Sequence, residues 1–150
     1  MLKTGDKAPE FDLVGDDGKK YSLKDFIGKK VVLYFYPKDD TSGCTAEACS
    51  FRDNIKNFEK KNAIIIGVSK DNTASHIKFK NKFELPFRLL SDESTKMLEK
   101  YEAWKEKSMY GRKYMGIERT TFIIDEKGYI TEIFRKVKVD GHIEEVLSKT

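Results

Sequence analysis

The chain contains, at residues 31 to 37, the run Val31-Val32-Leu33-Tyr34-Phe35-Tyr36-Pro37. An unbroken series of β-branched and aromatic residues predicts a strand that is buried on both faces. The proline ends this strand because it lacks the N–H group that the ladder needs. A second run of the same kind, from Ala63 to Ser69, predicts another buried strand.

Segments with helical periodicity alternate with these strands. Apolar residues between positions 48 and 58 recur on one helical face, which predicts a helix from about Thr45 to Lys61 with Thr41 or Ser42 as its cap. Further helices are expected at 72–83, 94–101 and 140–149, and hairpins at 11–22 and 120–137. This order predicts an α/β sandwich with a mainly parallel sheet and an antiparallel edge.

Length and composition narrow the class of protein. A chain of 150 residues is long enough for one domain, residues 1–150, with a substantial core. The 29 basic and 25 acidic residues are mixed along the chain, so the net charge of +4 does not indicate a nucleic-acid partner. No secretory signal is apparent, and no apolar run approaches the ~20 residues that cross a bilayer. We therefore expect a cytoplasmic protein that does not enter membranes.

The two cysteines, Cys44 and Cys49, lie just after the first buried strand. In a reducing compartment, a cysteine pair is more often catalytic or metal-binding than structural. Topology places Cys44 outside the carboxyl end of the strand, the edge where α/β sheets bind ligands. A thiol in the first turn of a helix faces free N–H groups and the positive end of the helix dipole, which favour a thiolate.

Ionisation by itself does not account for a highly reactive cysteine, because a thiolate loses nucleophilicity as its basicity falls. Hydrogen-bond donors aimed at the atom that leaves as the substrate bond breaks must contribute more. Arg119 is the best candidate, because it directly precedes the predicted strand 120–125. Thr41 is placed to donate a hydrogen bond to the sulfur or to the substrate that the sulfur attacks, and Pro37 fixes the strand exit and removes a competing donor.

The spacing of the cysteines predicts a conformational step. On one regular helix their Cα atoms would be about 8.6 Å apart, on faces roughly 140° apart. A disulfide needs Cα atoms within about 7 Å. Forming a bond between Cys44 and Cys49 therefore requires the first turns of the helix to unwind.

Residues 37 to 44 resemble the Pro-x-x-x-Thr-x-x-Cys signature of peroxiredoxins, and residues 35 to 53 are similar to the peroxiredoxin Q or bacterioferritin comigratory protein subgroup. The similarity continues through residues 104–107, 114–117 and 119–125. It implies a thioredoxin-like fold, with a central mixed sheet and an N-terminal β-hairpin. It also implies reduction of hydrogen peroxide and organic hydroperoxides, with electrons from thioredoxin or a similar dithiol protein.

The resemblance also assigns roles. It maps Cys44 to the peroxidatic position and Cys49 to the resolving position, and maps Pro37, Thr41 and Arg119 to the residues that shape the site. Ser42 departs from the subgroup, which usually has proline there. No cysteine follows Cys49, so an intramolecular disulfide and a monomer are expected.

Alternatives remain at this stage. A peroxide sensor that passes its oxidation to a partner protein is one, and a metal or redox-structural module is another. No cofactor or metal is expected, because two sulfurs are too few for structural zinc, and His76 and His142, lacking ligand spacing, are expected at the surface. Glu47 could orient Arg119 or be an exposed helix residue. The charges at 105–107 and 112–113 are expected in solvated loops.

Overall fold

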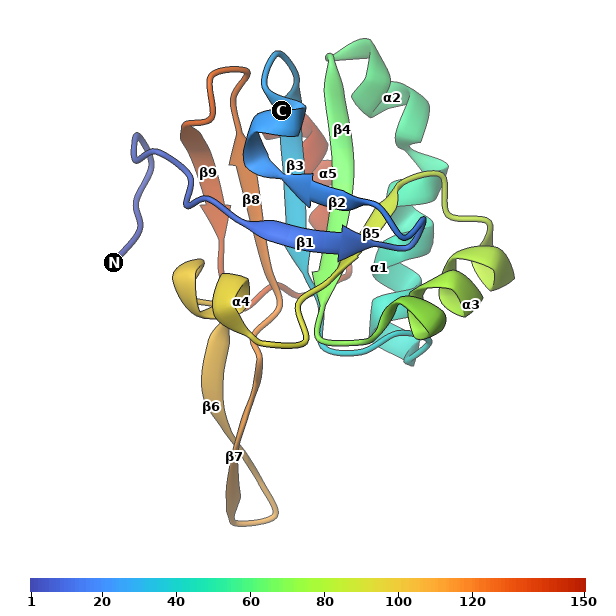
Figure 1. The fold of residues 1–150 in the computed structure, drawn as a ribbon, viewed down its shortest axis with the longest axis vertical. Helices are drawn as coiled ribbons and strands as arrows, with labels where there is room; N and C mark the ends of the chain where they lie inside the picture. The colour runs from blue at the N-terminus through green and yellow to red at the C-terminus, as the bar shows by residue number, and fades with distance from the viewer.

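The computed structural model describes all residues, 1–150, as a seven-stranded sheet between helices, with a two-stranded hairpin projecting from it (Figure 1). The strand order is β2-β1-β5-β4-β3-β8-β9. The strands of this sheet are β1 (Asp12–Gly15), β2 (Lys20–Ser22), β3 (Lys30–Phe35), β4 (Ala63–Ser69), β5 (Arg88–Ser91), β8 (Thr120–Ile124) and β9 (Ile130–Phe134). The helices are the 3-10 helix η1 (Leu23–Phe26), α1 (Ser42–Asp53), α2 (Ile55–Lys60), α3 (Thr73–Phe83), α4 (Lys96–Lys100) and α5 (His142–Lys149).

The α/β class and the central mixed sheet are confirmed, but the sheet is not mainly parallel, in contrast to what the order of the elements predicts. Only the pairings β3–β4 and β4–β5 are parallel. The predicted hairpins β1–β2 and β8–β9 are present and lie at the two edges, where β1 pairs antiparallel with β5 and β8 pairs antiparallel with β3. The short connection within each hairpin allows only antiparallel pairing. The antiparallel pairings at the two edges therefore outnumber the two parallel pairings in the centre of the sheet.

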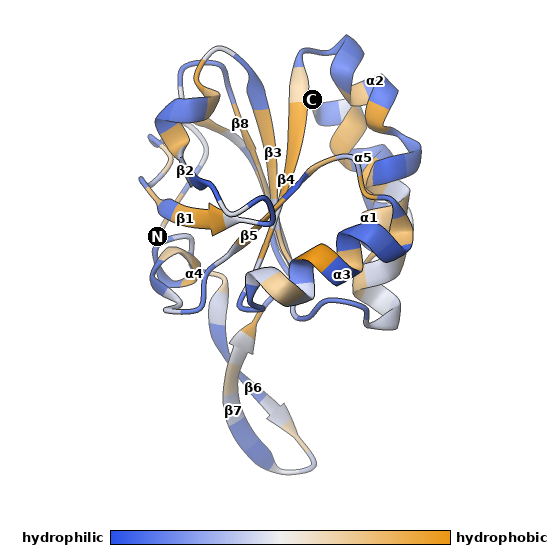
Figure 2. Cartoon of the chain, turned by 45° about the vertical axis from the view of Figure 1, so that its right-hand side comes forward, coloured by the Kyte–Doolittle hydropathy of each residue, from blue (hydrophilic) through white to orange (hydrophobic).

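Strand β3 divides the core in two, because its side chains alternate across the sheet. Val31, Leu33 and Phe35 belong to a cluster with residues of α4 and η1 on one face. Val32 and Tyr34 belong to a second cluster with residues of α1, α2, α3 and α5 on the other face. Figure 2 shows the hydrophobic residues concentrated in the central strands β3 and β4. Burial on both sides fixes β3 and the position at which it ends.

The single helix predicted from Thr45 to Lys61 is wrong in two respects. It begins earlier, at Ser42, and it is interrupted at Asn54, where α1 ends and α2 begins. Asn54 leaves the helical region with φ of −109° and ψ of 9°, and its side-chain amide donates to the carbonyl of Ser50 at 2.9 Å. Asparagine competes for backbone groups in this way, which is why it often ends helices.

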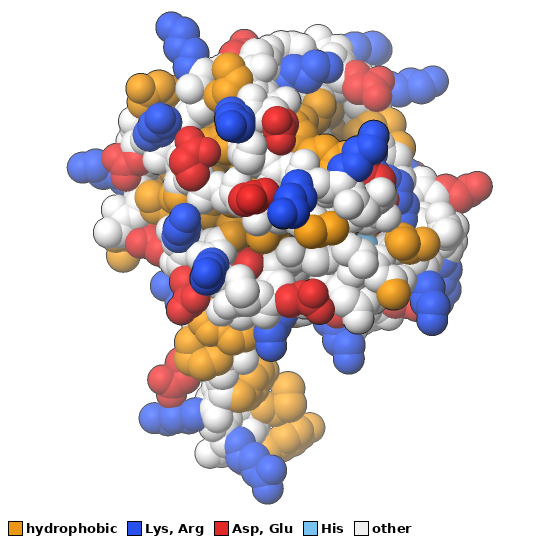
Figure 3. All heavy atoms as spheres, viewed as in Figure 1, with side chains coloured by type: hydrophobic (Ala, Val, Ile, Leu, Met, Phe, Trp, Pro, Cys, Tyr) orange, Lys and Arg blue, Asp and Glu red, His pale blue; other side chains and the backbone are white.

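A third hairpin, β6 (Trp104–Met109) and β7 (Arg112–Ile117), replaces the loops of solvated charges that the sequence predicts there. Its charged residues are mostly exposed, as expected, but they stand on paired strands that project from the body (Figure 1). Figure 3 shows acidic and basic side chains interspersed over the body and hydrophobic ones on this arm. The exposed hydrophobic residues of the arm are Met109, Tyr110, Tyr114 and Met115.

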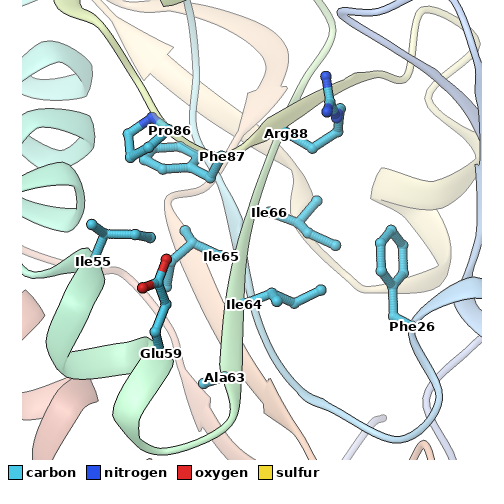
Figure 4. Close-up of a pocket in the computed structure, with 10 residues that line it drawn as sticks. All are labelled: Phe26, Ile55, Glu59, Ala63, Ile64, Ile65, Ile66, Pro86, Phe87 and Arg88. Carbon is cyan, nitrogen blue, oxygen red and sulfur yellow. The ribbon is translucent and has the colours of Figure 1, made fainter.

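A cavity of about 220 Å³ lies beside the first half of β4 (Figure 4). It is mostly apolar, and Ile55, Ile65 and Phe87 are among its lining residues. It forms there because β5 starts pairing with β4 only at Ile66. None of the predicted site residues lines it. No helix of the chain is both long enough and apolar enough to pass through a bilayer.

Candidate active site

Cys44 is the third residue of α1, and the segment 36–41 connects it to the carboxyl end of β3. The topological prediction is therefore confirmed for this residue. The side chain is buried, at 1% exposure, and both cysteines are free thiols. At this position the sulfur lies in the first turn of α1, where the unpaired N–H groups and the helix dipole stabilise a negative charge.

Arg119 reaches the sulfur from the end of the neighbouring strand. Strand β8 runs antiparallel to β3 with Thr120 opposite Phe35, so the residue before Thr120 lies at the end of β3. The Arg119 Nη2 donates to Cys44 Sγ at 3.4 Å, and its Nη1 donates to Glu47 Oε1 at 2.6 Å. The guanidinium thus bridges a thiol and a carboxylate that lie three residues apart on α1.

Glu47 is fully buried, so the sequence alternative of an exposed helix glutamate is wrong and the ion pair with Arg119 is confirmed. Burial raises the pKa of Glu47 to about 7, although the charge and hydrogen bond of Arg119 act in the opposite direction. Burial also acts to lower the pKa of Arg119, but Glu47 and Cys44 outweigh it and raise that pKa above its ordinary value. The guanidinium therefore stays charged, while the carboxylate titrates near neutrality.

Replacing Glu47 with glutamine is expected to remove a pH dependence of stability. In the folded chain Glu47 keeps its proton up to about pH 7, whereas its ordinary pKa is 4.5. The native state therefore binds the extra proton between these values, and the free energy of unfolding falls as pH rises through this window. Urea unfolding at pH 5 and pH 8 should show a smaller fall in Glu47→Gln than in the parent. Equal falls would contradict the assignment.

Gly43 permits the close approach of Arg119 to the start of α1. A Cβ atom at this position would lie 3.2 Å from Arg119 Nη2, closer than side chains normally tolerate. Ser42, where the resembling subgroup usually has proline, is the first residue of α1. Proline and serine are both accepted at the first helical position, so the departure leaves the helix start intact.

Thr41 and Pro37 lie in the segment between β3 and α1, as expected. Thr41 has the extended backbone of an N-cap, but its side chain makes no capping hydrogen bond. Instead its hydroxyl donates to the carbonyl of Lys38 at 2.8 Å, and the residue is exposed. A hydrogen bond from Thr41 to the sulfur is absent. Its action on a bound peroxide stays a prediction, as does the part of Pro37.

Cys49 is half-buried on the same helix, and α1 is continuous from Ser42 to Asp53. The two thiols are therefore presented on different faces of an intact helix. This is the arrangement from which the sequence predicts an unwinding step. The step itself stays a prediction.

Lys107, on the projecting hairpin, is a site neighbour that the sequence assigned to a solvated loop. Its stem lies over Gly116 of the partner strand, where a Cβ atom would be 3.2 Å from the lysine Cδ. Burial lowers the pKa of Lys107 and the charge of Arg119 lowers it further, while the neighbouring Glu118 and, to a smaller extent, Cys44 act in the opposite direction. The ammonium group is thus within electrostatic range of the sulfur.

We expect Lys107→Met to slow the reaction with hydrogen peroxide about fivefold, the effect of ~1 kcal/mol of lost charge stabilisation at the sulfur. Methionine keeps most of the length of the stem and removes the charge. The matched control is Lys113→Met on the same hairpin, whose side chain is 80% exposed and pairs with Glu106. Competition kinetics measure both rates, and equal rates would exclude Lys107 from the site.

The prediction that both histidines lie at the surface is wrong. His142 is 4% exposed, and its Nε2 lies 2.8 Å from the hydroxyl of Thr121. Burial lowers the pKa of His142 to about 4, and Arg119 contributes to the shift, so the imidazole is neutral at pH 7. His76 is fully buried and lies near Asp39 and Asp71, with donor atoms within 4.8 Å of one another. Contacts that bring distant residues together in this way leave no local sequence pattern.

The fold and the arginine-bound thiol at a helix start define a class, the thioredoxin-like thiol peroxidases. The profile of the AhpC/TSA family matches residues 4–133. The peroxiredoxin Bcp of Bacillus subtilis is 51% identical over 146 residues, which cover 97% of this chain and 93% of that protein.

The fold is also similar to solved structures of the same kind of protein. A cysteine-to-serine mutant of PrxQ from Xylella fastidiosa has a TM-score of 0.94 at 38% identity, and the match covers 99% of this chain and 95% of that one. The bacterioferritin comigratory protein of Xanthomonas campestris, studied for its alkyl peroxide reduction, has a TM-score of 0.88 at 39% identity over 92% of this chain and 88% of that one. The chain belongs to the AhpC/TSA family, and within it to the peroxiredoxins of the Bcp type, which are thiol-dependent peroxidases.

Proposed function

We propose that Cys44 is the peroxidatic thiol and Cys49 the resolving thiol of a hydroperoxide reductase. The Cys44 thiolate attacks one peroxide oxygen and the O–O bond breaks, and the departing oxygen takes up the proton that the thiol had released and leaves as water or an alcohol. The sulfenic acid that remains on Cys44 condenses with the Cys49 thiol and releases water. A dithiol protein such as thioredoxin then reduces the disulfide. The cycle uses two sulfurs and neither metal nor flavin.

The contact between Arg119 Nη2 and Cys44 Sγ, at 3.4 Å, is the observation that carries this proposal. A guanidinium beside the sulfur can also donate to the departing peroxide oxygen, on which charge develops in the transition state. Glu47 holds one arm of the guanidinium at 2.6 Å, so the donor is oriented before peroxide arrives. Pro37 and Thr41 shape the entrance between β3 and α1 in this scheme.

Stoichiometric oxidation tests the scheme directly. After one equivalent of hydrogen peroxide, both free thiols should be lost and the intact mass should fall by two hydrogens. A gain of one oxygen with one thiol retained would mean that Cys49 does not resolve the sulfenic acid. Retention of both thiols would refute the assignment of Cys44.

Steady consumption of peroxide with thioredoxin, its reductase and NADPH separates repeated turnover from the single oxidation of a sensor. We further propose a cytoplasmic monomer, since the cycle needs reduced dithiol partners and the disulfide is internal. Sedimentation of the reduced and oxidised forms at several concentrations checks the monomer. A larger species in the oxidised form would favour a disulfide between subunits.

A further inference from the structure

Asp39 stands out in the segment that leads from β3 to the helix cap. Of residues 37–41 it alone is buried, whereas its neighbours are half-buried or exposed. Its side chain is 3% exposed, although carboxylates are rarely buried unless they are paired. The residue lies two positions before Thr41, the N-cap of the helix that carries Cys44.

The buried carboxylate is held by three groups. Its Oδ1 accepts a hydrogen bond from the hydroxyl of Tyr36 at 2.6 Å. Its Oδ2 accepts from the hydroxyl of Ser75 at 2.8 Å and lies 2.7 Å from His76 Nδ1. The backbone N–H of Asp39 donates to Asp71 Oδ2 at 2.8 Å. The loop is therefore tied to the end of β3, to α3 and to the turn after β4.

The contacts of His76 show how strong this tie is. Its Nε2 lies 3.0 Å from the carbonyl of Leu90, which only accepts, so Nε2 carries a hydrogen. Its Nδ1 lies 2.7 Å from Asp39 Oδ2, so both ring nitrogens of this buried side chain have a polar partner. Breaking a buried pair of this kind leaves an unpaired polar group and is costly. The same hydrogen bonds occupy the oxygen and nitrogen atoms with which these side chains would coordinate a metal ion.

The rest of the loop is weakly held. Asp40 has a left-handed backbone, with φ of 58°, which costs energy for a residue other than glycine. Its side chain makes only an exposed ion pair with Lys82 at 2.8 Å, which contributes little. Asp39 is therefore the principal attachment of the segment that must move if α1 unwinds.

We propose that Asp39, held by His76, is a positioning residue that acts as a latch: it keeps the loop that precedes α1 in its closed position. The latch thereby sets how fast the helix unwinds for disulfide formation. This inference rests on the proposed function of Cys44 and Cys49. The latch favours the folded site, in which Arg119 contacts the sulfur and peroxide reacts. Loosening the latch moves the population toward the unwound form, in which Cys49 can reach Cys44.

Two reactions then compete for the sulfenic acid on Cys44. In one, the Cys49 thiol attacks the sulfur, and a disulfide and water form. In the other, a second hydroperoxide transfers an oxygen to the sulfur, and a sulfinic acid forms together with water or an alcohol. The second reaction needs the folded site, so the latch also sets how readily the chain overoxidises.

Asp39→Asn tests the latch, because the amide keeps the size of the side chain but cannot accept from all three partners. The matched control is Asp40→Asn, which makes the same change at the next residue, is tolerated in a left-handed backbone and breaks only the exposed pair. Tyr36→Phe removes one hydrogen bond to Asp39 and serves as a milder second variant. Quenched-flow mass spectrometry gives the rates of peroxide reaction and disulfide closure, and the sulfinic acid fraction at high peroxide.

In Asp39→Asn we expect closure to be faster and peroxide reaction slower, each by about tenfold, with a smaller sulfinic acid fraction. Tyr36→Phe should change all three in the same directions by less, and Asp40→Asn should match the parent. The latch would be overturned if Asp39→Asn and Tyr36→Phe left the division of the Cys44 sulfenic acid between disulfide and sulfinic acid unchanged. It would also be overturned if these variants slowed both the peroxide reaction and the disulfide closure. If the parent itself forms no disulfide, it is the proposed function that fails.

Discussion

Arg119→Lys is expected to slow the reaction of the reduced chain with hydrogen peroxide by about 10²- to 10³-fold, the loss seen when one oriented transition-state donor is removed. The guanidinium contacts Cys44 Sγ with one nitrogen and Glu47 with another. Lysine retains the positive charge, but a single ammonium lacks the planar fork that serves both partners at once. The effect therefore reports orientation rather than charge.

Competition for peroxide against a reference peroxidase measures this rate, with the reduced variant at equal thiol content. Arg112→Lys, on an exposed position of the hairpin, is the control for the same exchange away from the sulfur. A rate within about threefold of the parent would show that charge alone suffices, and the argument from the geometry of the fork would be wrong.

The sequence predicts those parts of the structure that depend on short-range patterns. The runs around Val32 and Ile65 are recognisable as buried strands because every residue in them is apolar or small. Once these strands are placed, the end of β3 and the following helix locate Cys44 without further information. Arg119 is marked in the sequence by its place directly before the predicted strand 120–125, but its nearness to the end of β3 is apparent only from the pairing of β8 with β3.

The remaining features depend on contacts across long stretches of chain. His76 is indistinguishable from a surface histidine until folding brings it to Asp39, 37 residues away in sequence. Glu47 is isolated in sequence from Arg119, its partner at a separation of 72 residues. The hairpin β6–β7 lacks the alternation of a strand because only its base, at Trp104 and Ile117, packs against the core, and the rest of it projects from the body. Such features are defined by the fold and not by the local sequence.

The two cysteines are expected to respond differently to the same substitution. Cys44→Ser should abolish peroxide consumption, because a serine hydroxyl is a far weaker nucleophile than a thiolate at neutral pH. Cys49→Ser should leave the first step intact, since Cys49 is a free thiol on another face of α1 and the hydrogen bond of Arg119 goes to the sulfur of Cys44. That variant should consume one equivalent of peroxide and stop with a sulfenic acid on Cys44.

A sulfenic-acid reagent such as dimedone, with intact mass, distinguishes the two variants after one equivalent of peroxide. Cys49→Ser should gain one oxygen, or one label when the reagent is present, and Cys44→Ser should gain neither. Normal consumption by Cys44→Ser would show that the roles are wrongly assigned. Continued turnover of Cys49→Ser with thioredoxin would mean that the reductant attacks the sulfenic acid directly, and then α1 would not have to unwind during catalysis.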